Sequence, residues 1–352
     1  MNKKIKVALI TAKGDLDPNT GNGNHRYMYE LYQNMKNNNR INISNIESPT
    51  LPIIGSGLSF FLFNCTRNFS GFNILHNLDF KPVMPLRKNN CTFISTVLDL
   101  QPILYPELSQ DIERTYKEKL WSLLVIKSGI QLSLRADFII AISSQTRDEV
   151  VKCGYDKNNI KVVNVGVDER FFSDMPVKKE RRRFTVGYIG ALRAKKNVQF
   201  AIKAFNNIES QDTCLEIWGK REFMYDELTE IAKKNKMISF KGFAPEEKLV
   251  DIYDSFDAFV FPSMHEGFGL PIIEAQARGI PVIIDKNGKI PREVRKYCFE
   301  AKDEEDMAEI IMKLKANGYD KKTREKMIAY ARSFTWEKCT EKTLEVYYKI
   351  SG

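Results

Sequence analysis

The chain has 352 residues, a usual length for two domains, and 43% of them are hydrophobic, enough to fill two cores. No run of about 18 apolar residues is present, and the basic start passes into a strand pattern without a cleavage site, so we expect a cytoplasmic protein with neither a membrane span nor a signal peptide. The net charge of +9 favours anionic partners, but lysine is spread along the whole chain, so charge alone does not choose among them.

The first half of the chain alternates apolar runs with helical segments. Six runs predict strands, at residues 5–11, 41–46, 72–76, 92–98, 137–142 and 160–164. Helices are predicted at about 25–35, at about 109–134 and after the cap residues Ser143 and Ser144. The unusually apolar segment 57–63 predicts a core helix, and a lipid-contacting surface is the alternative.

The loop after the first strand is rich in turn residues and contains Gly21 and Gly23. Strand, glycine loop and helix together are typical of the opening of a βαβ unit. The loop lacks the third glycine of a dinucleotide fingerprint, so a flexible surface turn remains the alternative interpretation.

A short charged stretch, residues 176–183, separates the two halves. It predicts a solvated hinge rather than a nucleic-acid surface, because it is short and lacks interleaved aromatic residues. Strands are predicted after it at 184–189, 214–218, 237–241, 257–261 and from 282 onward. Helices are predicted up to about 208, at about 245–255, from Pro271, at about 304–315 and at the end of the chain.

Two runs of alternating strands and helices predict an α/β fold of two Rossmann-like, doubly wound domains that face each other across a cleft. We place the first domain at residues 1–175, the linker at 176–183 and the second domain at 184–334. Ligands of such sheets bind at the carboxyl ends of the strands, where we expect the glycine loops of this chain to lie.

The stretch 261–281, FPSMHEGFGLPIIEAQARGIP, is the most informative part of the chain. A buried strand leads into a loop with Glu266, Gly267 and Gly269, and a proline then opens a helix. A helix N-terminus beside glycines is an anion-binding geometry. Glu266 and Glu274 lie eight positions apart, so both carboxylates can face one crevice and accept hydroxyls of a ligand that also carries phosphate. The alternative is a well-capped helix with two solvated glutamates.

A second loop of this kind follows the predicted strand at 184–189. Gly190 is followed by the cations Arg193, Lys195 and Lys196 at the start of a helix. Glycine and positive charge at a helix start suit a diphosphate.

The run from Glu266 to Glu274 resembles the signature of the family-4 retaining glycosyltransferases, which have the GT-B fold, both in its Glu-x7-Glu spacing and in Gly-Phe-Gly-Leu-Pro. The resemblance is dense between Gly187 and Val282 and thin before about residue 130. It also covers the end of the chain, and this implies that residues 335–352 form a helix crossing back to the first domain.

The resemblance implies a role for each residue of the signature. Glu274 would hold the ribose hydroxyls of a nucleotide sugar, and Glu266 would hold hydroxyls of the transferred sugar. Backbone amides would contact the sugar and the diphosphate, in a substrate-binding set that comprises His265, Gly267, Phe268, Gly269 and Leu270.

The other loops of the second half receive roles in the same way. Lys196 stands where the family has a lysine on the diphosphate, but Ala191 replaces a frequent arginine, so Arg193 or Lys195 would supply the second cation. Gly190 belongs to the same loop, and the backbone at Gly242 and Phe243 would meet the nucleobase.

In the first half, Gly21 and Gly23 would let the backbone approach the donor diphosphate and the acceptor. Asp99 is expected at the catalytic side, at the end of its strand. Many family members have His-Asp here, but this chain has Leu98, so either an apolar wall faces the sugar or His76 substitutes. A structural role for His76 is the alternative.

The function implied is a retaining glycosyltransferase that moves a sugar from a donor such as a UDP- or GDP-sugar to a hydroxyl of a glycan or lipid-linked glycan. We expect no metal, no other cofactor and no nucleic-acid partner, and peripheral contact with the inner membrane face stays open. The six cysteines lack metal-ligand spacing and predict reduced packing residues. The alternatives are a non-catalytic nucleotide-sugar-binding protein and an epimerase or phosphorylase of the same fold.

Overall fold

The computed structural model describes residues 4–12, 14–17, 23–48, 67–78, 91–109, 127–173, 183–221 and 224–351. Contacts divide the chain into two compact units. Unit 1 takes its described residues from Met1–Pro106, Glu113–Gly166 and Trp336–Gly352, and unit 2 takes its own from Glu107–Ile112 and Val167–Thr335. Five sequence predictions lie wholly or largely outside the described residues: Gly21, Cys65, the segment 57–63, the helix expected at about 109–134 and the linker up to residue 182.

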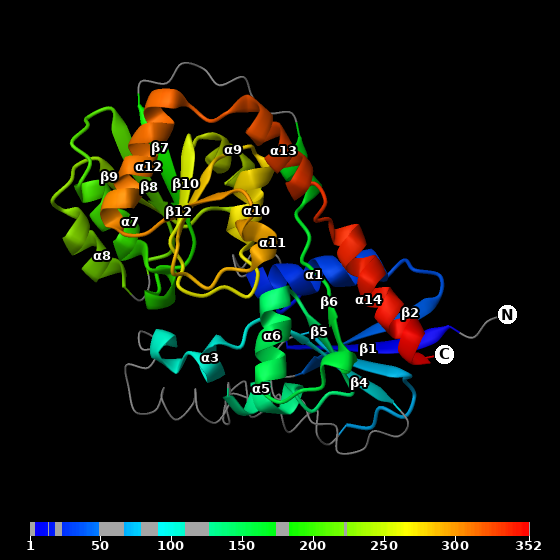
Figure 1. Ribbon diagram of the computed structural model, residues 1–352. Helices are drawn as coiled ribbons and strands as arrows, with labels where there is room; N and C mark the ends of the chain where they lie inside the picture. The colour runs from blue at the N-terminus through cyan, green and yellow to red at the C-terminus, as the bar shows by residue number, and fades with distance from the viewer. Residues whose placement is uncertain are drawn as a thin grey trace. The chain divides into compact units, whose positions relative to one another are not determined.

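Unit 1 is built on a six-stranded parallel sheet in the order β2-β1-β3-β4-β5-β6 (Figure 1). The strands are β1 Ile5–Ala12, β2 Ile41–Ser48, β3 Ile74–Asn77, β4 Thr92–Val97, β5 Phe138–Ala141 and β6 Ile160–Val162. Its helices are α1 Gly23–Met35, α3 Gln101–Leu104, α5 Ser128–Ser133, α6 Ser144–Lys152 and α14 Trp336–Ser351. The six strands confirm the six predicted apolar runs.

Unit 2 has a second six-stranded parallel sheet, in the order β12-β11-β10-β7-β8-β9. The strands are β7 Phe184–Ile189, β8 Thr213–Trp218, β9 Ile238–Gly242, β10 Ala258–Phe261, β11 Val282–Asp285 and β12 Cys298–Ala301. The helices are α7 Val198–Asn206, α8 Tyr225–Ala232, α9 Leu249–Asp254, α10 Leu270–Ala277, α11 Arg292–Arg295, α12 Glu304–Asn317 and α13 Lys321–Ala331. The fold class predicted from the sequence, α/β with two Rossmann-like parallel sheets, is confirmed.

Four elements of unit 2 were not predicted: α8, α11, β12 and α13. The edge strand β12 is only partly buried, so it lacks the continuous apolar run that marks the central strands. Helix α11 has four residues, too few to show a helical period. Helix α13 buries only Met327 and Ala331, so its apolar stripe is narrow, although Asp320 caps it at the backbone N–H of Thr323.

The closing helix α14 packs on α1 within unit 1, the red helix beside the blue one in Figure 1. The rings of Trp336 and Tyr27 have centroids 6.2 Å apart. A buried polar chain joins the two helices to the sheet: Tyr27 Oη lies 3.2 Å from Thr96 Oγ1, which lies 2.9 Å from His76 Nε2. His76 Nδ1 then lies 2.6 Å from the Tyr347 hydroxyl. Because these buried side chains hydrogen-bond to one another, burying their polar groups costs little free energy.

Candidate functional site

The strand order of unit 2 reverses between β7 and β10. These neighbours pair in parallel, Phe259 opposite Gly187, while β8 and β9 lie on one side of them and β11 and β12 on the other. In doubly wound sheets, ligands bind outside the carboxyl ends of the strands at such a switch point. The two loops that leave β7 and β10 there are residues 190–197 and 262–269, and they are the two loops singled out in the sequence.

Backbone hydrogen bonds tie these loops together. Met264 N donates to Lys195 O at 2.8 Å. A third loop, which follows β11, is attached in the same way: Glu266 N donates to Lys289 O at 3.0 Å, and Lys289 N donates to Met264 O at 2.9 Å. Gly288 in this loop approaches so closely that an added Cβ would lie 2.3 Å from Ser263 O. The three loops therefore hold their side chains in fixed relative positions.

Lys196 and Glu266 form an ion pair at this place. Lys196 Nζ lies 2.5 Å from Glu266 Oε1, and Ser263 Oγ donates to the same oxygen at 2.5 Å. The side chains of the pair are 17% and 11% exposed. Lys196 Nζ also lies 5.2 Å from the centre of the Phe261 ring, a cation–π contact. The fold thus places a largely buried positive charge and its counter-ion at the switch point.

Two neighbours shape the surroundings of the pair. Tyr188 is fully buried and donates to Ala191 O at 3.0 Å, and the pKa of its hydroxyl is raised well above 10, first by burial and then by the negative charge of Glu266. Asn197, directly after Lys196, has a left-handed backbone with φ of 50°, which ends the short 3₁₀ turn Ala194–Lys196. Asparagine tolerates this conformation better than most residues.

Helix α10 begins at Leu270, one residue before the predicted start at Pro271, which lies in its first turn. Gly269, with φ of 99°, makes the turn into the helix, a conformation that favours glycine. Glu274 on α10 is 5% exposed, and its Oε2 accepts a hydrogen bond from the Tyr253 hydroxyl at 2.9 Å. Glu274 and Glu266 are therefore held by different partners.

The carboxyl ends of β7, β8 and β9 approach each other through glycines. Gly190 N donates to Trp218 O at 2.9 Å, and Gly219 N donates to Gly242 O at 2.8 Å. A Cβ on Gly219 would lie 2.5 Å from Gly190 O, so only glycine fits there without a shift of the backbone. At this edge Phe243 is 40% exposed, and Lys220 Nζ lies 4.8 Å from the centre of its ring.

Three further predicted residues of unit 2 have identifiable structural places. The side chain of His265 is fully buried, and its backbone makes a parallel bridge with Lys289. Phe268 is buried, and its ring centroid lies 5.8 Å from that of Phe334. Arg193 is the cap residue before the 3₁₀ turn that carries Lys196. In this structure His265 and Phe268 pack the loop, and their side chains are not on its surface.

Among the described residues of unit 1, Gly23, His76 and Asp99 were predicted to belong to the site. The carboxylate of Asp99 accepts the backbone N–H of Gln101, the first residue of α3, at 2.7 Å. His76 is fully buried with both ring nitrogens hydrogen-bonded, which favours the structural role left open from the sequence. Leu98 is buried, and Gly23 is the first residue of α1.

Sequence reasoning missed residues that hold the site together. Tyr253 carries no motif signal because it acts on Glu274, 21 positions away, and Asn197 carries none because it acts through its backbone angle. Ser263 acts on Glu266 only three positions away, but a serine in a loop has no distinguishing pattern in the sequence. In unit 1 it also missed Asp15, buried after β1, whose Oδ2 accepts Ala12 N at 2.5 Å and whose Oδ1 lies 3.7 Å from His25 Nε2. An aspartate in a turn looks like any solvated turn residue in the sequence.

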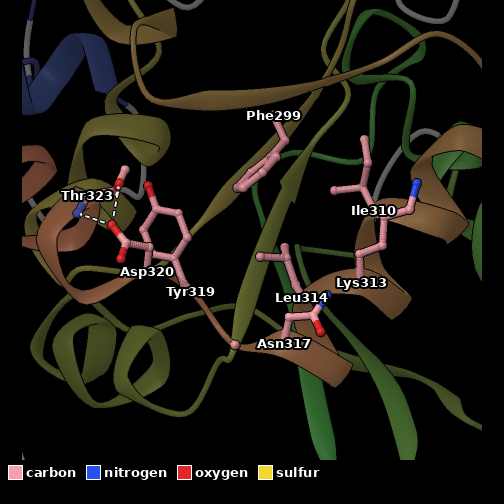
Figure 2. Close-up of a pocket in the computed structure, with 9 residues that line it drawn as sticks. Phe299, Ile310, Lys313, Leu314, Asn317, Tyr319, Asp320 and Thr323 are labelled. Carbon is pink, nitrogen blue, oxygen red and sulfur yellow. Dashed lines mark hydrogen bonds between the residues drawn. The ribbon is translucent and has the colours of Figure 1, made fainter.

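Figure 2 shows a pocket of about 440 Å³ elsewhere in unit 2. Phe299 of β12, Leu314 of α12 and Tyr319 form apolar walls, and the Asp320 carboxylate at its edge accepts the N–H and the hydroxyl of Thr323. None of the predicted site residues lines this pocket. It is therefore separate from the site at the switch point.

Within the described part of the chain, no group of three or more His, Cys, Asp or Glu side chains is arranged to hold a metal ion. The five cysteines that the structure describes are free thiols. No helix among these residues has the length and apolar character needed to cross a bilayer.

Residues 170–334, which contain all three loops of the site, match the family model described as glycosyl transferases group 1. This segment is a glycosyltransferase group 1 domain. The group 1 domain carries Lys196, Glu266 and Glu274, whereas Gly23, His76 and Asp99 precede it.

Curated relatives cover part of the chain. O-antigen chain mannosyltransferase B of Escherichia coli is 26% identical over 231 residues, 60% of each chain. A probable sucrose-phosphate synthase of Thermosipho melanesiensis is 30% identical over 206 residues, 55% of this chain and 48% of the relative. The chain thus spans between about half and three fifths of the length of these two relatives.

Solved structures resemble the whole chain in fold. Sucrose-phosphate synthase from Thermosynechococcus elongatus has a TM-score of 0.76 at 17% identity, covering 99% of both chains. HepE from Anabaena, in complex with UDP and glucose, has a TM-score of 0.69 at 15% identity, covering 98% of this chain and 100% of its own. The fold that contains the group 1 domain is GT-B, as the sequence predicted.

Proposed function

We propose that this protein transfers a sugar from a nucleoside diphosphate sugar to a hydroxyl of a glycan or lipid-linked glycan. The observation that carries the proposal is the Lys196–Glu266 pair at the switch point between β7 and β10. A positive charge for phosphate and a carboxylate for hydroxyls stand side by side where doubly wound sheets bind ligands. The group 1 domain match over the same residues supports it.

The charges of the site suit a leaving diphosphate. When the bond to the sugar breaks, negative charge grows on the phosphate oxygens. Lys196, Arg193 beside it and the N-terminus of α10 would offset that charge. Because fixed cations can carry this load, we propose that the reaction needs no metal.

The two carboxylates would bind hydroxyls rather than attack the sugar. In a retaining glycosidase two carboxyl groups stand about 5 Å apart around the bond that is cut, and one is the nucleophile. Here Glu266 is paired with an ammonium and Glu274 accepts from a tyrosine, so neither is arranged as a free nucleophile. We therefore propose retention by a front-face route, in which the leaving phosphate assists deprotonation of the acceptor, within the family-4 pattern.

The loop ends of β8 and β9 would receive the nucleobase. The exposed Phe243 ring offers a face for stacking, and Lys220 beside it offers a donor for a carbonyl oxygen of the base. One structural neighbour is described in complex with UDP and glucose, and one relative is named a mannosyltransferase. Uridine and guanosine diphosphates with glucose or mannose are therefore the first donors to screen.

A thermal-shift screen of nucleoside diphosphates and their sugars tests the binding step. A ligand of the folded state stabilises it by about 2.7 kcal/mol at 100 times its Kd. The donor found should then be consumed in the presence of glycan acceptors, and much more slowly by Lys196→Ala. Absence of any nucleotide binding would refute the proposal.

Turnover measurements separate the alternatives. Binding without transfer or hydrolysis would indicate a non-catalytic nucleotide-sugar-binding protein. A change of the donor without acceptor would indicate an epimerase, and dependence on inorganic phosphate would indicate a phosphorylase.

A further inference from the structure

We propose that Glu266 is an internal counter-ion that competes with a diphosphate for Lys196, and that this pair makes the site prefer the sugar-bearing donor over the free nucleoside diphosphate. The inference rests on the proposed function and adds a specificity device to it. It also assigns a positioning role to Ser263.

Lys196 and Glu266 form an ion pair with each other, so each charge already has a partner in the protein. The Nζ–Oε1 distance is 2.5 Å, and both side chains are largely buried. Ser263 Oγ donates a hydrogen bond to the same carboxylate oxygen. The next residue, Met264, donates its backbone N–H to Lys195 O. The ammonium that a diphosphate needs is therefore already neutralised by the protein.

A diphosphate that takes Lys196 must separate this pair. It then leaves the Glu266 carboxylate without its cation and close to a new anion, in partly desolvated surroundings where like charges repel strongly. A free nucleoside diphosphate has no sugar hydroxyls to donate hydrogen bonds to Glu266. Its terminal phosphate also has one more ionisable oxygen than the phosphate of a nucleotide sugar.

A nucleotide sugar reduces both costs, the loss of a partner for the Glu266 carboxylate and the repulsion between like charges. It has less negative charge on the terminal phosphate, and its sugar hydroxyls donate hydrogen bonds to the carboxylate that Lys196 has left. The pair thus favours the complete donor. After transfer, Glu266 loses those hydroxyls and competes again for Lys196, which promotes release of the nucleoside diphosphate product.

Ser263 sets how well Glu266 competes. Its hydroxyl donates to Glu266 Oε1, and its own backbone oxygen is packed against Gly288, so the donor is fixed in place. Without this hydroxyl the carboxylate is less well held beside Lys196. The nucleoside diphosphate should then bind more tightly while the folded structure is kept.

Isothermal titration of the full chain with a nucleoside diphosphate, UDP or GDP, and with its glucose or mannose derivative tests the inference. Glu266→Gln should bind the nucleoside diphosphate at least tenfold more tightly, equal to about 1.4 kcal/mol, without tighter binding of the nucleotide sugar. Glu266→Gln thus lowers the ratio of the nucleoside diphosphate Kd to the nucleotide-sugar Kd. Ser263→Ala should lower the same ratio by about threefold. The gain of Glu266→Gln should disappear when Lys196→Ala is added.

Glu309→Gln is the matched control, because it removes the same charge from an exposed ion pair with Lys313 on α12. It should leave both Kd values unchanged. Unchanged or weaker nucleoside diphosphate binding by Glu266→Gln would overturn the inference and leave the proposed function standing. Absence of nucleotide binding by the wild type and by Glu266→Gln would refute both. If Glu266→Gln does not fold, the ratio of the nucleoside diphosphate Kd to the nucleotide-sugar Kd is compared between Ser263→Ala and the wild type. An unchanged ratio overturns the inference.

Discussion

Acid should destabilise unit 1 through His76. The ring is fully buried between β3, β4 and α14, with its nitrogens 2.6 Å from the Tyr347 hydroxyl and 2.9 Å from Thr96 Oγ1. Burial lowers the pKa of His76 from 6.5 to about 3. The folded chain therefore keeps a neutral imidazole at pH values where the unfolded chain binds a proton.

The size of the effect follows from this difference. Because the folded-state pKa lies below the unfolded value, the contribution of His76 to the free energy of unfolding is complete above about pH 6.5. It is lost as the pH falls toward 3, by about 1.4 kcal/mol for each pH unit below the unfolded pKa. Between pH 7.5 and 5.5 the expected loss from this residue is about 1.4 kcal/mol.

Urea unfolding followed by circular dichroism at these two pH values measures the loss. The wild type should show it and His76→Gln should lack it, although the variant is less stable at both pH values because Thr96 and Tyr347 lose their partner. Tyr347→Phe is the control: it removes one hydrogen bond but keeps the ring buried, so the pH dependence should remain. Parallel pH dependence of the wild type and His76→Gln would refute the reasoning.

Three more predictions concern the switch-point loops. Lys196→Ala should lower kcat by about 100-fold or more in a sugar-transfer assay, the scale seen when a group that stabilises developing charge is removed, and an unchanged rate would exclude Lys196 from the mechanism. Tyr253→Phe removes the hydrogen bond to Glu274 and should weaken donor binding by about tenfold in titration calorimetry, whereas equal affinity would mean that Glu274 does not need its orientation fixed. Asn197→Val should lower the free energy of unfolding by about 1–2 kcal/mol in urea because of its left-handed backbone, while Asn197→Gly should not; equal losses would point to the side chain instead.

Local signals predicted the elements well. Apolar runs marked every strand of the two sheets except β12, and β7 has the predicted bounds of 184–189. Ser143 caps α6 by accepting the N–H of Thr146 at 3.0 Å, as expected for serine before a helix. These features depend on neighbours a few positions away. Elements whose pattern is weak or too short, such as β12 and α11, could not be found in this way.

Site chemistry was predicted in part. Glycines and cations after one strand, and glutamates with glycines after another, were enough to identify both loops from the sequence. Their pairing was not predicted, because Lys196 and Glu266 lie 70 positions apart. The hydrogen bond that Asp99 accepts from the backbone N–H of Gln101 was not predicted either, and its catalytic role stays a prediction.

The sequence by itself determined the α/β class, the strands and the two loops rich in glycine and charge, since these follow from hydrophobic period and turn chemistry along the chain. Only the tertiary structure decided which loops are neighbours. The order that sets β7 beside β10 closes the Lys196–Glu266 pair, and the return of α14 to unit 1 buries His76. Both depend on contacts between distant segments, whose partners are fixed by packing rather than by the local pattern.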